Sequence, residues 1–263
     1  MRVPVVQHRG RRRRALGRRA LWTGGELLVT AGVVLLLLVV HELWWTNREA
    51  RQGAEHQVEA LERQWATQSP TSAPAPGAVG GANPSDNTGA TGGSSSRRNT
   101  TTATGAGGST TPRASQAYAV LTIPRLHFRV PVAEGVSKQN VLNKGYVGHY
   151  PGTQQPGQAG NFALAGHRNT HGEPFRYLPR LRLKDTVQVE TSTATYTYTV
   201  DKILPQTSAA DSGVIRPIPR SIVKPSYGYS QPGYYITLTT CTPEFTSRYR
   251  MAVWGTLTST HSR

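Results

Sequence analysis

Apolar and polar positions are distributed unevenly along the 263 residues of this chain. An apolar run from about Leu27 to Val40 extends with interruptions to Trp45, and short alternating runs return only after residue 117. The first pattern predicts a membrane-spanning helix, because Glu26 to Trp45 just reaches the roughly 20 residues that cross a bilayer core. The later runs alternate with a period of two, which predicts β-strands.

Strand patterns dominate residues 118–263, which we predict to be one folded domain. Thr193 to Val200 alternates strictly and is the clearest half-buried strand. The candidate strands are 119–123, 128–132, 146–149, 161–168, 186–191, 194–204, 234–241 and 249–257. Residues 137–144 and 173–181 are candidates for short helices. Eight strands that close on themselves leave no exposed edge, so we predict an all-β barrel or a tightly curled sandwich with one or two short helices.

Two segments without strand patterns connect the apolar run to this domain. Residues 46–68 are polar, with Val58, Leu61 and Trp65 at i, i+3, i+7 spacing. That spacing would permit a weak coiled coil or a helix lying on lipid headgroups, but we predict a solvated juxtamembrane stalk. Residues 69–117 are mostly Gly, Ser, Thr, Ala, Pro and Asn, a composition that cannot offset the entropy of folding. We therefore expect a disordered linker that lifts the domain off the membrane.

The charge of the N-terminal segment predicts the orientation of the helix. The first 20 residues contain eight arginines and no acidic residue, and such flanks stay in the cytoplasm. We predict a basic cytoplasmic tail over 1–20, a single-pass signal-anchor in the cell membrane over 21–45, and an extracellular remainder. A cleaved signal peptide is the alternative, but no A-x-A-like site follows Val40.

The net charge of +16 bears on the partners of the chain. A basic stripe can bind nucleic acid, but an extracytoplasmic domain rarely meets any, so we expect no nucleic-acid partner. Anionic wall polymers, phospholipid headgroups or a pyrophosphate-linked precursor are the expected electrostatic partners.

The residues that bind cofactors and metals are scarce. One cysteine and scattered histidines give no zinc-ligand spacing. The long loop 208–233 contains a single acid, Asp211, which is too few for calcium. No P-loop or dinucleotide fingerprint is found, and we expect neither a cofactor nor a metal.

Cys241 is the only cysteine of the chain, so no internal disulfide explains it. It ends the β-branched run that starts at Tyr234, and Thr242-Pro243 stops that run. The odd cysteine of an exported protein is either paired between molecules or reactive. A buried structural thiol is the alternative, although its polar threonine neighbours speak against it.

Two further residues of catalytic type stand at comparable places. His167 lies at the end of the strand pattern 161–168, and Arg250 opens the last strand pattern. Cys, His and Arg at the ends of three strands predict a thiol transpeptidase site. Arg248 competes with Arg250, because alternate residues of a strand point the same way. His149, which we interpret as a turn residue, and His171, interpreted as a solvated loop residue, compete with His167.

Several of these motifs together resemble the sortase family, and most of all the class E sortases of actinobacteria. They are Leu121-Thr122-Ile123-Pro124, Gly148-His149-Tyr150-Pro151-Gly152-Thr153, the run 161–168, Thr237-Leu238-Thr239-Thr240-Cys241, and Arg250. The resemblance covers the whole domain after the linker. It implies a sortase-type eight-stranded barrel, in agreement with the strand count, and it favours His167 over His149 and Arg250 over Arg248.

The resemblance also implies a reaction. Sortases cut a sorting signal near the C-terminus of a secreted protein between Thr and Gly, hold the acyl group as a thioester, and pass it to an amine of a lipid-linked peptidoglycan precursor or wall cross-bridge. Cys241 would be the nucleophile, as a thiolate beside an imidazolium, and His167 the general acid and base. Arg250 would bind the substrate or the oxyanion, and Thr240 would shape the substrate groove.

Two questions stay open on the residues alone. Class E resemblance implies a Leu-Ala-x-Thr-Gly signal in place of the more widespread Leu-Pro-x-Thr-Gly. A catalytically degenerate, membrane-tethered wall-binding β-domain is the alternative function, but it would leave Cys241, His167 and Arg250 unexplained.

Overall fold

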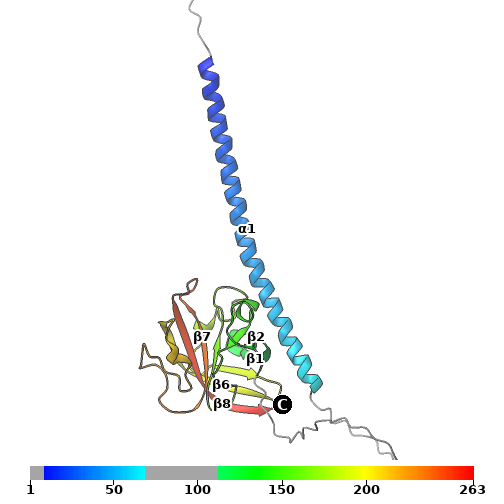
Figure 1. The fold of residues 1–263 in the computed structure, drawn as a ribbon, viewed down its shortest axis with the longest axis vertical. Helices are drawn as coiled ribbons and strands as arrows, with labels where there is room; N and C mark the ends of the chain where they lie inside the picture. Colours follow the sequence, from blue (N-terminus) through cyan, green and yellow to red (C-terminus); the bar gives the residue numbers. More distant parts are fainter. Residues whose placement is uncertain (1–8, 69–111) are drawn as a thin grey trace, which may run out of the picture.

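The computed structural model describes residues 9–68 and 112–263 of the chain. One long helix, α1 (Arg9–Gln68), runs past a closed eight-stranded barrel (Figure 1). The predicted linker over 69–117 lies outside the described residues as far as residue 111, and so do residues 1–8 of the basic tail.

Each of the eight strands overlaps one of the eight strand patterns of the sequence, and the all-β barrel is confirmed. The pattern over 161–168 forms a strand only as far as Ala165, and the last strand extends beyond the predicted 257 to Ser262. They are β1 (Ala117–Ile123), β2 (Phe128–Glu134), β3 (Val147–His149), β4 (Gly160–Ala165), β5 (Thr186–Glu190), β6 (Ala194–Ser208), β7 (Tyr234–Thr242) and β8 (Tyr249–Ser262). Their order around the barrel is β1-β2-β3-β4-β7-β8-β6-β5. The short helices are all of the 3-10 type: η1 (Pro124–Leu126), η2 (Leu142–Lys144), η3 (Leu178–Arg180) and η4 (Ser212–Ile215). Of these, η2 and η3 fall inside the two predicted helical segments.

Alternation along each strand separates the inside of the barrel from its outer face. Ile236 and Leu238 of β7 belong to the large buried core. Thr237 and Thr239, which alternate with them, are also buried. The hydroxyl of Thr237 donates to the backbone oxygen of Val214, 3.2 Å away in the loop between β6 and β7. That loop therefore covers part of the outer face of β7.

Asp211 holds the β6–β7 loop together from within. Its carboxylate accepts hydrogen bonds from the Thr207 hydroxyl at 2.5 Å, from the Ser221 hydroxyl, and from the backbone N–H of Ile222 at 3.0 Å. Burial alone would raise the pKa of Asp211, but the hydrogen bonds outweigh it and lower the pKa. The one acid of this loop is thus committed to the loop's own structure.

Replacing Asp211 with alanine should destabilise the domain, because two buried hydroxyls and a backbone N–H would lose their acceptor. We expect a loss of about 1–3 kcal/mol in the free energy of unfolding, measured by urea denaturation. The difference from wild type should shrink as the pH falls through the lowered pKa of Asp211, since a protonated carboxyl no longer accepts these bonds as well. Lys224→Ala, at an exposed position of the same loop, is the control, and an equal loss there would contradict the assignment.

The second half of α1 packs against the barrel, which corrects the prediction of a solvated stalk over 46–68. Val58, Leu61 and Trp65 form a buried cluster with Val120 of β1, and Ala54 joins the barrel core. The sequence marked this stripe by its spacing. It could not show that Val120, an outward-facing residue between two inward-facing ones, needs an apolar cover. The helix supplies that cover, so residues 46–68 hold the barrel close and do not space it away.

The first half of α1 is different in kind. It contains one stretch long and apolar enough to cross a membrane. Its large apolar side chains from Leu27 to Val40 are exposed, since no other described part of the chain covers them. α1 therefore combines an uncovered apolar half with a half that belongs to the folded domain.

Candidate active site

Cys241 is the penultimate residue of β7, and its side chain is half-buried. It is in phase with Thr237 and Thr239 and out of phase with the core residues Ile236 and Leu238. Its side chain accordingly belongs to the outer face of the barrel. The alternative of a buried core thiol does not fit this position.

His167 is brought to the same place by the pairing of two parallel strands. β4 and β7 pair with Ala165 opposite Thr239. His167 and Cys241 are each two residues further along. The chain that leaves β4 thus carries the histidine past the strand end, near the end of β7 that carries the cysteine.

Further hydrogen bonds hold these two chain segments together beyond the ladder. The backbone N–H of Gly166 donates to Thr239 O at 3.1 Å, and the Thr240 hydroxyl donates to Gly166 O at 2.9 Å. The guanidinium of Arg168 donates to Cys241 O at 3.2 Å. The residues on either side of His167 are therefore tied to the segment 239–241 that ends in Cys241.

The environment of His167 favours its neutral form. Its Nε2 lies 2.9 Å from Asn143 Oδ1, so Nε2 carries the hydrogen and Nδ1 keeps its lone pair. Burial, together with the nearby His171 and Lys138, lowers the pKa of His167 to about 4. The imidazolium expected beside the thiolate is thus disfavoured in the free site at neutral pH, and Nδ1 is the nitrogen able to accept a proton.

Arg250 lies directly opposite Cys241 in the antiparallel pairing of β7 and β8. Directly opposed residues share a face, so its side chain starts beside the thiol. Its Nη1 donates to Ser247 O at 2.8 Å and to Tyr249 O at 2.9 Å. Arg248 is exposed, and its guanidinium lies over the Tyr249 ring at 5.2 Å. The register places Arg250, not Arg248, opposite the cysteine.

Thr240, which we predicted to shape the substrate groove, is a buried residue of β7. It is 3% exposed, and it alternates with Cys241, so its side chain faces inward. Its hydroxyl braces Gly166, and its role in shaping the substrate groove stays a prediction. Thr239 is the threonine in phase with Cys241, and its hydroxyl lies 3.1 Å from the Tyr150 hydroxyl.

The two competing histidines differ from their predicted settings. His149 is the last residue of β3 and is 1% exposed, so it is not a turn residue. Its Nδ1 lies 2.7 Å from Glu134 Oε2, and its Nε2 lies 2.9 Å from Thr153 Oγ1. His149 is thus a buried structural side chain. His171 is half-buried and stacks on the His167 ring with centroids 5.4 Å apart, so it is not a solvated loop residue.

Sequence reasoning missed the roles of three residues that contact the predicted site, although it had named one of them, His171, as a loop residue. Asn143 orients His167, His171 stacks on it, and Arg168 bonds the backbone of Cys241 as well as the Thr242 hydroxyl at 3.0 Å. Arg168 had a signal, because it directly follows the histidine. Asn143 had none, because it lies 24 positions before His167 and only the fold brings the two together.

Metal binding by the part of the chain that the structure describes would need a cluster of side chains that can act as ligands. No group of three or more His, Cys, Asp or Glu side chains there could hold a metal ion. The site brings together a thiol, the stacked imidazoles of His167 and His171, and two guanidinium groups.

Comparison with known proteins places this arrangement in a family. The sortase domain family model matches residues 121–258, slightly more than half of the chain. Sortase SrtE1 of Streptomyces coelicolor is 41% identical over 244 residues, which cover 91% of this chain and 57% of the relative. The chain therefore spans little more than half of that relative's length. Sortase SrtE2 of the same organism is 35% identical over 259 residues, covering 95% of this chain and 88% of the relative.

Solved structures agree with the sequence comparison. The crystal structure of Sortase E1 from Streptomyces coelicolor with a tripeptide in the active site shares 48% identity and a TM-score of 0.54, over 58% of this chain and 94% of that one. Sortase E from Streptomyces avermitilis shares 40% identity and a TM-score of 0.51, over 57% and 93% of the two chains. From the family match, these relatives and the shared barrel, the chain belongs to the sortase family and is most similar to its class E members.

Proposed function

We propose that this chain is a membrane-anchored cysteine transpeptidase that cleaves a C-terminal sorting signal between Thr and Gly. The proposal is supported by strand pairing, which places Cys241, Arg250 and the chain segment of His167 at one end of a sortase barrel. Cys241 lies opposite Arg250 on β8 and beside the chain segment of His167. A degenerate wall-binding domain would have no need for this arrangement.

In the first half-reaction the thiol of Cys241 becomes the nucleophile. Nδ1 of neutral His167 takes the thiol proton as the sulfur attacks the carbonyl carbon of the signal's Thr. The tetrahedral intermediate collapses with cleavage of the Thr–Gly bond, and His167 returns the proton to the leaving Gly amine. A thioester on Cys241 remains, and His167 is neutral again.

The second half-reaction reverses these roles. An acceptor amine attacks the thioester, and His167 takes a proton from it. The C–S bond breaks, a new amide forms, and the proton returns to the Cys241 sulfur. Arg250 stabilises the negative charge on the carbonyl oxygen in both tetrahedral intermediates, where a fixed cation is most effective. The lowered pKa of His167 suits this cycle, because each half begins with a neutral imidazole.

The substrates follow from the family and from α1. Similarity to class E sortases supports a Leu-Ala-x-Thr-Gly signal over Leu-Pro-x-Thr-Gly, and an amine of a lipid-linked peptidoglycan precursor or wall cross-bridge as acceptor. The apolar half of α1 supports a single-pass anchor in the cell membrane, with the arginine-rich N-terminus cytoplasmic and the barrel extracellular. The clients are then secreted proteins that bear the signal.

Peptides carrying the two signals test the reaction directly. We would incubate the full chain in detergent micelles with each peptide and follow the mass of the intact protein. The expected result is an acyl adduct on Cys241 that hydroxylamine releases, formed faster with the Ala-containing peptide. A folded protein with a free thiol that neither peptide acylates would overturn the proposal in favour of the wall-binding alternative.

Arg250 and Arg248 form a matched pair for a second test. Arg250→Ala should lower kcat/KM for peptide cleavage about 10²- to 10³-fold, the usual effect of removing one oxyanion donor. Arg248→Ala should stay within a few-fold of wild type, since that side chain is exposed and lies over Tyr249. Arg250→Lys should restore only part of the activity, because an ammonium lacks the planar fork of the guanidinium. Equal losses from the two alanine variants would contradict the assignment.

A further inference from the structure

We propose that the catalytic end of the barrel rests on the surface of the membrane that anchors the chain. Residues 168–176, which follow His167, and residues 242–248, which follow Cys241, would contact lipid headgroups. This inference rests on the proposed anchoring through α1 and goes beyond the proposed reaction. The contacts between α1 and the barrel carry it.

The first contact joins α1 to the segment that follows His167. The Asn47 amide donates to Glu173 Oε1 at 3.1 Å and accepts from the backbone N–H of Gly172 at 3.3 Å. Arg51 forms an ion pair with Glu173 Oε2 at 2.7 Å and donates to Gly172 O at 3.1 Å. Glu173 is buried. This end of the barrel is thus fixed to one turn of the helix.

That turn lies directly beyond the apolar half of the helix. Asn47 comes two residues after Trp45, and Arg51 comes six residues after Trp45. These separations are about 3 Å and 9 Å along the helix axis at 1.5 Å per residue. The headgroup region on each side of a bilayer core is roughly 5–8 Å thick. If the apolar half spans the core with Trp44 and Trp45 at the interface, Gly172 and Glu173 lie in the headgroup region or at its outer edge.

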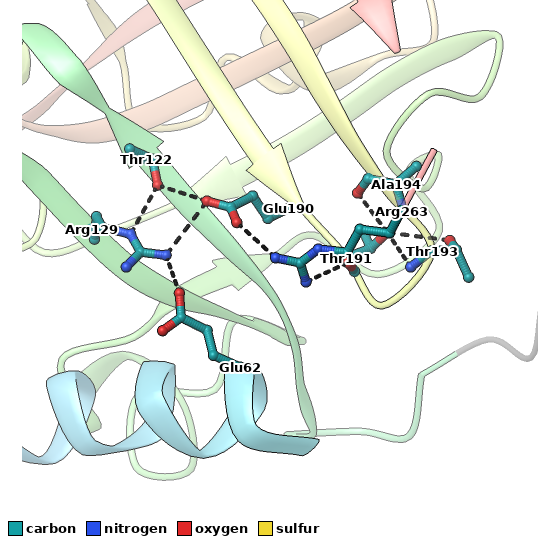
Figure 2. Close-up of polar contacts among 8 residues, drawn as sticks. All are labelled: Glu62, Thr122, Arg129, Glu190, Thr191, Thr193, Ala194 and Arg263. Atoms are coloured by element: carbon teal, nitrogen blue, oxygen red, sulfur yellow. Dashed lines mark hydrogen bonds and ion pairs between the residues drawn. The ribbon is translucent and has the colours of Figure 1, made fainter. Parts of the chain in front are cut away.

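A second contact fixes the orientation of the barrel along the helix. Figure 2 shows Glu62 of α1 joined to Arg129, which also reaches Glu190 at the end of β5. Trp65 lies 4.8 Å from the guanidinium of Arg263, next to the end of β8. Trp65 is 18 residues, or about 27 Å, beyond Asn47 on the helix.

Two contacts this far apart leave the barrel little freedom to turn on the helix. The C-terminal end of β8 lies far from the apolar half of α1, and the turn between β7 and β8 lies on the side nearer to it (Figure 1). The catalytic residues stand at this nearer end. The fold therefore points the proposed active site toward the membrane.

The segment after Cys241 is held at the same level along the axis of α1 as Glu173. Arg176 pairs with Glu173 at 2.8 Å and with Glu244 at 3.0 Å, so a chain of ion pairs runs from α1 to the β7–β8 turn. The next residue, Phe245, is 74% exposed. A large aromatic side chain in water is unfavourable, but phenylalanine side chains enter the boundary between headgroups and acyl chains favourably. Phe245 therefore has a physical reason to enter the headgroup region.

The charges at this end agree with an anionic lipid surface. Lys138, Lys144 and Arg248 are exposed there. Lys144 precedes Gly145, whose backbone packs so closely on Ala50 of α1 that an added Cβ would lie 2.7 Å from the Ala50 oxygen. The acids Glu173 and Glu244 are paired with arginines. Exposed cations of this kind are attracted to an anionic membrane surface.

A single labelled cysteine can measure the depth of this end in a membrane. In a Cys241→Ser background we would place one cysteine by Phe245→Cys, or by Ser192→Cys at the exposed turn between β5 and β6, near Arg263. The full chain would be labelled with an environment-sensitive fluorophore and inserted in vesicles of phosphatidylcholine and phosphatidylglycerol. Lipids with a quencher on the headgroup or upper acyl chain would then be added.

We expect the label at position 245 to be quenched several-fold more than the label at 192. A double variant, Val58→Asp with Leu61→Asp, disrupts the apolar stripe that holds the barrel on α1. It should abolish the difference in quenching between the two labels while the anchor stays inserted. A label at 245 that is as exposed to water as the label at 192, in protein shown to be inserted and folded, would overturn the inference. Acylation by peptides in micelles reports the proposed reaction separately, so the two proposals can fail independently.

Discussion

Replacing Cys241 with alanine should abolish the acyl-enzyme and lower peptide cleavage by a factor on the order of 10⁴ or more. Without the thiol no thioester can form, and removal of the nucleophile from other enzymes that use covalent catalysis lowers kcat by a factor of about 10⁶. The side chain is half-buried on the outer face of the barrel, so the free energy of unfolding should change by about 1 kcal/mol or less. Intact-mass analysis and single-turnover cleavage measure the first effect, and urea denaturation measures the second.

A matched variant separates chemistry from structure. Thr239→Ser, two residues earlier on the same face of β7, keeps the hydroxyl that donates to Leu164 O at 3.0 Å and should keep most of the activity. If the Cys241→Ala protein still cleaved peptides at a measurable fraction of the wild-type rate, Cys241 would not be the nucleophile. The wall-binding alternative predicts instead that binding to wall polymer is the same with and without the thiol.

His167→Ala should lower kcat/KM by about 10²- to 10⁴-fold, the usual contribution of a general acid and base. In the wild type, kcat/KM should fall as the pH drops through the His167 pKa of about 4, because the protonated imidazole cannot accept the thiol proton. Lys138→Ala removes a nearby positive charge, so it should raise the pKa and move this acid limb to higher pH. Lys224→Ala, in the β6–β7 loop, should leave the limb in place.

The lowered pKa of His167 also predicts a pH dependence of stability. The histidine is harder to protonate in the folded than in the unfolded chain, so its contribution is complete above the unfolded value of about 6.5. That contribution is lost as the pH falls through about 4. His167→Gln should remove this part of the acid sensitivity, measured by urea denaturation from pH 7 to pH 4. For activity, the neutral-imidazole mechanism would be contradicted if kcat/KM fell with a midpoint near pH 6.5 and Lys138→Ala did not move that midpoint.

The strand content of the domain was legible because it depends on local alternation. Strictly alternating runs such as Thr193–Val200 place every second side chain in a core, and each such run became a strand. Cys241 and Arg250 stood out for a related reason, since residues at strand ends reach the surface. Their direct opposition is a matter of register between β7 and β8, which depends on pairing across the sheet and not on either strand alone.

The settings of several polar residues depend on long-range contacts and could not be inferred. Asn143 orients His167, and the buried His149 pairs with Glu134, only because the barrel folds those segments together. Thr240 matched a family motif, yet one step of alternation turns its side chain away from the surface that Cys241 faces. Sequence similarity carries residue identity, whereas the pleat of the strand decides direction.

By itself the sequence determined the order of the parts: an apolar span, a polar segment, eight strands and a thiol at a strand end. Local periodicity and composition encode each of these. Only the tertiary structure decided that residues 46–68 join the barrel, because the apolar cover needed by Val120 comes from a helix more than 50 positions away in the chain. The docking of α1 on the barrel also sets the position and orientation of the end that carries Cys241 relative to the apolar half of the helix. That docking depends on contacts between segments distant in the chain, which local periodicity does not encode.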